Sequence, residues 1–388
     1  MLIANNSKNK FNGKRLKSAR KYREKSMSDL SKDIGVSRQT ISQYEHGLIS
    51  PQFEILMKIV NSLNFPKEYF YENNGIDIGL GNTYFRASSR MSKKEENAQK
   101  EKTKIIGRIF SFLNEYIEFP ELNIPNFEEE MEIEDMANKL REYWGLGSDP
   151  IKDIIYVLEK NGIIITSMNT RSKNIDAFSQ QQDINGIKHF LIVLGNDKNS
   201  AVRRQFSVAH ELGHIIMHDA FLDIEDLTKD ELRSMEQDAH KFAAAFLLPK
   251  EKFIEDVSIY PTDLNYYKEL KKKWRTSISA MLVRANQLEV ITNSSYQTLM
   301  KKMSKLGWRM KEPLDDTLIV KEPTILKRAI DIILDNDILD EDEIIENLSK
   351  TGLTLNREEI ELLLGLDEGK LKSKKNNNNV IKMALKNR

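Results

Sequence analysis

The pentad His-Glu-Leu-Gly-His at residues 210–214 constrains this 388-residue sequence more than any other segment. Apolar residues from 206 to 216 surround it at helical spacing, so we expect the pentad to lie on a helix. Residues four apart share one helix face, which lets His210 and His214 reach a single tetrahedral metal ion. Glu211 then lies beside the ion, close enough to take a proton from water bound there. The pattern predicts two metal ligands and a catalytic base.

A catalytic zinc ion needs a third protein ligand and an open position. The chain has no cysteine, so the ligands must be histidines and carboxylates. Glu236 is our preferred third ligand, because it follows on the next predicted helix, where small alanines allow close helix packing. His240 is the rival ligand, and His218 is expected beside the site or in the packing. A buried histidine pair without metal is the alternative to a zinc site.

The pentad belongs to a longer run, RRQFSVAHELGHIIMH at residues 203–218, which resembles the ImmA/IrrE metallopeptidases. The similarity continues in Glu236-x-x-Ala239 and in Leu-Leu-Pro at 247–249, and it covers roughly residues 105–312. The resemblance implies a zincin-like α+β domain in which His210, His214 and Glu236 bind zinc and Glu211 is the general base. It also implies a cytoplasmic enzyme that cleaves a repressor protein.

The sequence leaves open which residue would stabilise the oxyanion that forms when a peptide bond is cleaved. Arg203, Arg204 and His218 are candidates, although each could instead be a surface charge or a packing group. His240 is a further candidate for the surroundings of the ion.

The first 60 residues are basic, with twelve Lys and Arg against five Asp and Glu, a net charge of +7. Such a segment can approach a polyanion. Residues 37–47, SRQTISQYEHG, read as a DNA-recognition helix capped by Ser37. Ile41 and Tyr44 face inward in this interpretation. The side chains that could contact bases or phosphates, together with the cap, are Ser37, Arg38, Gln39, Thr40 and Gln43.

Residues 11–71 resemble the XRE helix-turn-helix family of phage repressors. One departure is Met27, which stands where that family commonly has a polar contact residue. The resemblance implies binding to double-stranded operator DNA, and a homodimer is expected because one domain reads about half an operator. A helical bundle used for protein contacts is the alternative.

We expect a multidomain, mainly α protein. An all-α helix-turn-helix bundle at 11–71 is followed by a linker at 72–104 and by the peptidase domain at 105–260, with a small three-stranded sheet formed by 163–167, 177–180 and 189–194. A helical C-terminal region at 261–366 and a disordered basic tail at 367–388 complete the chain. No apolar run approaches the roughly 20 residues of a membrane helix, so no membrane partner is expected.

Three functions compete. The first is an active peptidase whose DNA-binding domain places it near its target or represses its own operon. The second is a transcriptional regulator or antitoxin whose peptidase-like domain senses a partner or ligand without proteolysis. The third is a regulator for which zinc is the signal. The intact set of His210, Glu211, His214 and Glu236 favours the first, because an open three-ligand site suits catalysis.

Overall fold

A computed structural model of the chain describes residues 10–73, 75, 78–85, 92–128, 130–168, 176–195, 200–217 and 227–374. Helices dominate these ranges, and four strands form one mixed sheet, as expected for a mainly α protein with a small sheet. In the described part of the chain, no helix has both the length and the apolar character that crossing a bilayer requires.

The N-terminal bundle is helical throughout. It contains α1 (Gly13–Tyr22), α2 (Met27–Ile34), α3 (Arg38–Glu45), α4 (Phe53–Leu63) and the 3-10 helix η1 (Lys67–Tyr71). Helix α2 ends at Gly35, whose φ of 73° lies in the left-handed region that glycine adopts without steric cost. Ser37 then caps α3 by accepting a hydrogen bond from the Thr40 amide. These adjacent stop and start signals produce the tight turn between α2 and α3.

The sheet has four strands rather than the three that we expected. Its order is β1 (Ile78–Phe85), β3 (Ala177–Ile184), β4 (Ile187–Gly195) and β2 (Ile164–Met168). Strand β2 runs parallel to β4, and the other two pairings are antiparallel. The additional strand, β1, comes from residues 72–104, which we expected to be a linker. The last part of that segment, residues 93–104, belongs to helix α5 (Lys93–Leu113).

Each face of the sheet contributes to a hydrophobic cluster, and β4 shows the alternation between the two. In β4, Leu191 and Val193 face one hydrophobic cluster, whereas Ile192 and Leu194 face the other. The second cluster contains α7 (Ile154–Lys160), α8 (Ala201–Met217) and α9 (Lys229–Leu247). Helix α8 therefore packs against this face of the sheet.

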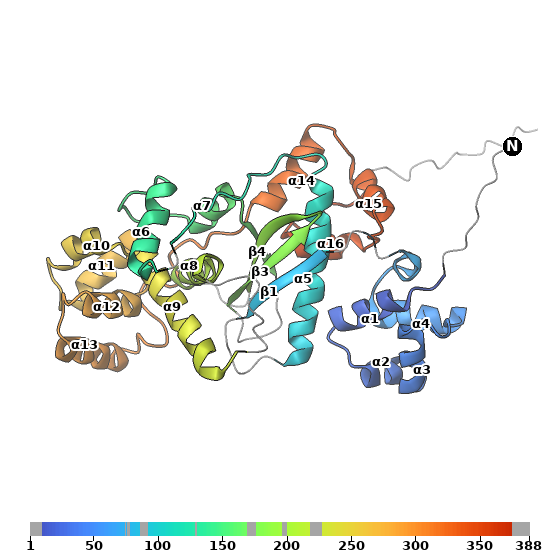
Figure 1. The fold of residues 1–388 in the computed structure, drawn as a ribbon, viewed down its shortest axis with the longest axis horizontal. Helices are drawn as coiled ribbons and strands as arrows, with labels where there is room; N and C mark the ends of the chain where they lie inside the picture. Colours follow the sequence, from blue (N-terminus) through green and yellow to red (C-terminus); the bar gives the residue numbers. More distant parts are fainter. Residues whose placement is uncertain are drawn as a thin grey trace, which may run out of the picture.

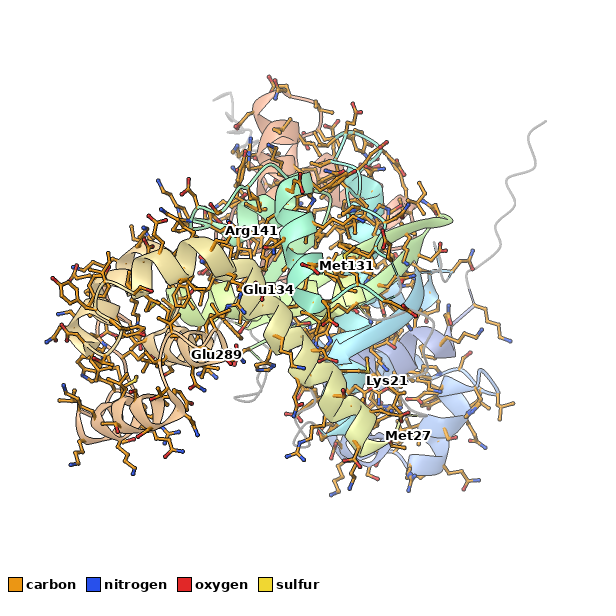
Figure 2. All side chains as sticks on the ribbon, turned by 60° about the vertical axis from the view of Figure 1, so that its left-hand side comes forward. Lys21, Met27, Met131, Glu134, Arg141 and Glu289 are labelled. Carbon is orange, nitrogen blue, oxygen red and sulfur yellow. The ribbon has the colours of Figure 1, made fainter. Side chains whose placement is uncertain are left out.

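Further helices extend the core around α8 and α9. They are α6 (Ile133–Tyr143), α10 (Lys250–Val257), α11 (Leu264–Trp274), α12 (Ile278–Gln287) and α13 (Asn293–Lys305). Arg141 of α6 donates hydrogen bonds to the carbonyls of Phe246 and Gly147, at 2.6 and 2.7 Å. Glu134, also on α6, accepts one from Arg284 of α12 at 2.5 Å. Figure 2 shows Glu134 and Arg141 on this helix, which fixes the C-terminal end of α9.

The C-terminal helices α14 (Ile325–Asp335), α15 (Glu341–Lys350) and α16 (Arg357–Leu364) pack on the opposite side of the sheet. They share one hydrophobic cluster with α5 and with the N-terminal bundle. Leu371 is fully buried there, so residues 367–374 pack against the fold instead of starting a disordered tail. The rest of the expected tail, 375–388, lies outside the described residues. Figure 1 shows the sheet between α5 and α8, with α10–α13 at one end and α1–α4 at the other.

Candidate metal centre

Two imidazoles from α8 and one carboxylate from α9 converge at a buried point. The Nε2 atoms of His210 and His214 are 3.1 Å apart. Glu236 places one carboxylate oxygen 3.3 Å from Nε2 of His210 and the other 3.4 Å from Nε2 of His214. Both histidine side chains are almost completely buried, and that of Glu236 is 20% exposed. Within the described ranges, these three residues form the cluster that could hold a metal ion.

Each of the three separations is close to one edge of a coordination tetrahedron, and the two N–O separations run to different oxygens of the Glu236 carboxylate. Zinc binds imidazole nitrogen and carboxylate oxygen at about 2.0–2.2 Å, which makes each tetrahedral edge about 3.3–3.6 Å. The distances of 3.1, 3.3 and 3.4 Å lie close to that range. The residues therefore fit a zinc ion with three protein ligands and leave the fourth position for another group.

Close contact between α8 and α9 brings Glu236 within reach of the histidines. A Cβ atom added at Gly213 would lie 3.2 Å from the Cα and carbonyl oxygen of Ala239. Glycine in a helix costs about 1 kcal/mol relative to alanine, but here it lets the two backbones approach. Gly213 therefore marks a point where the two helix backbones lie close to each other.

The protonation states suit metal binding. Burial lowers the pKa of His210 to about 4, so its imidazole is neutral at neutral pH. Burial alone would raise the pKa of Glu236, but its hydrogen bonds to His210 and His214 hold that pKa well below the ordinary value. His210 therefore offers a neutral nitrogen and Glu236 an ionised carboxylate, which are the forms that coordinate zinc.

Glu211 projects from the same helix and is only 1% exposed. The hydroxyl of Ser179, on β3, donates a hydrogen bond of 2.7 Å to Oε2 of Glu211. A small cavity lined by Ala177, Phe206, Ser207, His210 and Glu211 opens beside these groups. The sequence did not lead us to assign a role to Ser179. Ser179 and Glu211 are 32 residues apart in the sequence, and only the folded structure brings them together.

Comparison with known families agrees with this geometry. Residues 158–286 match the IrrE N-terminal-like domain of peptidase family M78, and residues 16–70 match a helix-turn-helix family. The chain carries an IrrE N-terminal-like domain and a helix-turn-helix domain. The first match contains all three residues of the metal-ligand cluster together with Glu211. No match was found among curated proteins.

Other candidates in the IrrE N-terminal-like domain have different surroundings. His240 is outside the three-residue cluster; its Nδ1 donates to the Glu236 carbonyl at 2.7 Å, and its ring centroid is 4.3 Å from that of His210. Arg203 pairs with Asp176 at 2.7 Å. Arg204 is mostly buried, pairs with Glu322 and donates to the Lys321 carbonyl. His218 lies outside the described residues.

In the helix-turn-helix domain, the predicted contact residues lie on and just before α3. Arg38 and Gln39 are exposed, whereas Thr40 and Gln43 are half-buried. The exposed Ser37 is engaged in capping α3. Behind this surface, Arg20 donates hydrogen bonds of 2.5 and 2.9 Å to the Glu45 carboxylate, which ties α3 to α1. Helix α3 is thus held against α1 by this ion pair, while its Arg38 and Gln39 are exposed.

Proposed function

We propose that this chain is a zinc-dependent endopeptidase that also binds double-stranded DNA. In this proposal it cleaves a specific regulator, such as a repressor or an antitoxin-like protein, and binds an operator through α3. The proposal rests chiefly on one observation: His210, His214 and Glu236 form a cluster of ligand atoms that fits zinc, with Glu211 beside it.

Zinc bound by these three residues would supply a Lewis acid that acidifies water and polarises the scissile carbonyl. Glu211 accepts the proton of the attacking water and later passes it to the leaving amine. Ser179 orients the Glu211 carboxylate through the 2.7 Å hydrogen bond.

The DNA-binding part of the proposal rests on the helix-turn-helix match and on the exposed Arg38 and Gln39 of α3. Arginine and glutamine can each form paired hydrogen bonds with purine edges in the major groove. We further propose that two chains bind one operator, because a single domain of this kind reads about half of a symmetric site.

The decisive experiment is Glu211→Gln. The purified variant should bind about one zinc ion per chain, like the parent protein, because Glu211 is not one of the three ligands. The rate at which the variant cleaves its protein substrate should fall about 10²- to 10⁴-fold, the usual effect of losing a general base. Suitable test substrates are repressor-like proteins encoded beside the gene, and electrophoresis or mass spectrometry would detect the fragments.

A matched control is Glu255→Gln, which removes an exposed carboxylate on α10. It should leave both zinc content and cleavage unchanged. If Glu211→Gln retained full biological activity, the peptidase proposal would be wrong. The chain would then be a regulator whose peptidase-like domain senses a partner or ligand.

A further inference from the structure

A cleft away from the metal centre is lined mainly by positively charged side chains. They are Lys152, Arg204, Arg275 and Lys321, and among the described lining residues the one carboxylate is that of Asp153. The cleft encloses about 300 Å³ of space that is continuous with solvent. None of the metal-ligand residues borders it, and the proposed catalytic base lines a different cavity. The cleft is therefore distinct from the metal centre.

The four cationic side chains come from four separate parts of the chain. Lys152 precedes α7, Arg204 lies in the first turn of α8, and Arg275 directly follows α11. Lys321 belongs to the segment between α13 and α14. Because like charges repel, such a group is stabilised by acidic side chains or by a bound anion. The ion pairs around the cleft show how much of this charge the protein itself offsets.

Two of the four cations have acidic partners. Arg204 pairs with Glu322, and the Nζ atom of Lys321 lies 3.9 Å from the Asp153 carboxylate. In the part of the chain that the structure describes, the other two cations take part in no ion pair. Two positive charges thus remain without a partner in the cleft, and a phosphate group carries up to two negative charges at neutral pH.

Arg204 is already held in place at this cleft. Its side chain is 6% exposed, and its Nη1 atom both pairs with Glu322 and donates a hydrogen bond of 3.2 Å to the Lys321 carbonyl. Within the described ranges, the Nε and Nη2 donors of this guanidinium are left for another acceptor. Ala201, the first residue of α8, also lines the cleft, so the positive end of the helix dipole lies beside it.

We propose that this cleft binds a phosphate group, either as inorganic phosphate or as the phosphate of a monoester, between Arg204, Arg275 and Lys152. The fork of N–H donors on an arginine matches the spacing of phosphate oxygens, and lysine adds a point charge. A bound phosphate would connect the start of α7, the first turn of α8 and the end of α11. The site does not depend on the proposed peptidase function, because it shares no residue with the metal centre.

The backbone at Arg275 allows a substitution that removes the charge without disturbing the fold. Arg275 caps the end of α11 with a φ of 52°, in the left-handed region that costs energy for every residue except glycine. Its amide donates to the Lys271 carbonyl, a hydrogen bond that glycine can also make. Arg275→Gly should therefore lose the guanidinium while the melting temperature of the phosphate-free protein stays equal to or above that of the parent.

Calorimetric titration of the zinc-loaded protein with inorganic phosphate, at constant ionic strength, tests the site. The parent should bind one phosphate per chain, and Arg275→Gly should bind it at least about tenfold more weakly, as expected for the loss of a charged hydrogen-bond donor. The control is Arg328→Ala, which removes an exposed arginine from a different cleft, between α7 and α14. It should keep the affinity of the parent, and a loss equal to that of Arg275→Gly would show general charge attraction and overturn the proposal.

Two other results would also overturn the proposal. One is the absence of saturable binding at millimolar phosphate. The other is an unchanged affinity in Arg275→Gly, which would place the anion elsewhere, for example on the zinc ion. Thermal unfolding gives a second measurement, because saturating phosphate should raise the melting temperature of the parent more than that of Arg275→Gly.

Adenosine monophosphate distinguishes the two sources of the phosphate group. Tighter binding of this monoester than of inorganic phosphate would show that the cleft takes the phosphate of a larger molecule. Weaker binding would identify free phosphate as the ligand, and either result supports the site if Arg275→Gly abolishes the preference. None of these measurements uses cleavage, so a failure of the peptidase proposal would leave them valid.

Discussion

The Glu211 carboxylate depends on a partner from a distant part of the sequence, the Ser179 hydroxyl at 2.7 Å. We expect Ser179→Ala to lower kcat about 10- to 100-fold, because a hydrogen bond to a charged group is worth about 1.5–3 kcal/mol. Zinc content should stay the same, because Ser179 contacts Glu211 and none of the three metal-ligand residues. Steady-state kinetics and metal analysis of the variant would check both expectations.

Ser111→Ala is the matched control at this scale. Ser111 is also buried, and its hydroxyl accepts a hydrogen bond from Asn185, away from the metal centre. Its loss should reduce the free energy of unfolding by about 1 kcal/mol without lowering kcat. If Ser179→Ala behaved in the same way, Ser179 would only stabilise the fold.

At the scale of elements, the site depends on how closely α8 and α9 approach. Gly213→Ala should weaken zinc binding about tenfold, because the new Cβ would press on backbone atoms of Ala239 at 3.2 Å and move Glu236 away from the histidines. Alanine favours the helix by about 1 kcal/mol, so the thermal stability of the metal-free protein should fall little. Calorimetric titration with zinc measures the affinity, and an unchanged value would contradict this account of the helix contact.

Helix α3 supports a second prediction at this scale. Arg38→Ala and Gln39→Ala should each weaken binding to DNA from the native promoter by about 1–3 kcal/mol, because each removes a side chain able to read a base edge. Lys58→Ala on α4 removes one exposed positive charge and is the control for Arg38→Ala. Fluorescence anisotropy at fixed salt would compare them. Equal effects of Arg38→Ala and Lys58→Ala would indicate a general loss of charge instead of base recognition.

At the scale of the whole molecule, the C-terminal helices join the DNA-binding bundle to the sheet. Glu359 of α16 accepts a hydrogen bond from the Tyr22 hydroxyl and pairs with Arg23 at 2.5 Å. Leu363 belongs to the same helix, and its carbonyl accepts a hydrogen bond from the Thr166 hydroxyl of β2. One helix therefore contacts both the bundle and the sheet.

Glu359→Ala should loosen this junction, because it removes the partner of Arg23 and of a buried tyrosine. We expect a loss of about 1–3 kcal/mol in stability and faster hydrogen exchange in α1. Glu361→Ala is the control, since Glu361 accepts hydrogen bonds from the amides of Gly369 and Leu371 and makes none of these contacts with the bundle. If both variants changed exchange in α1 equally, Glu359 would have no special role in docking the bundle.

The sequence by itself determined the features that depend on local spacing. Four-residue spacing places His210 and His214 on one helix face, and the combination of Gly35 and Ser37 specifies the turn before α3. The acidic partner helix with its small alanines was sufficient to predict Glu236. Each of these patterns acts over a few residues or between consecutive helices, where chain connectivity limits the alternatives.

Only the tertiary structure decided the contacts between distant segments. Strand β1 was predicted as part of a linker because its glycines give a weak strand signal, and its pairing depends on β3, about a hundred residues later. The contact of Ser179 with Glu211 and the packing of α14–α16 between the sheet and the N-terminal bundle arise in the same way. Such contacts depend on which surfaces remain to be buried after the local elements form, and no short stretch of sequence records that.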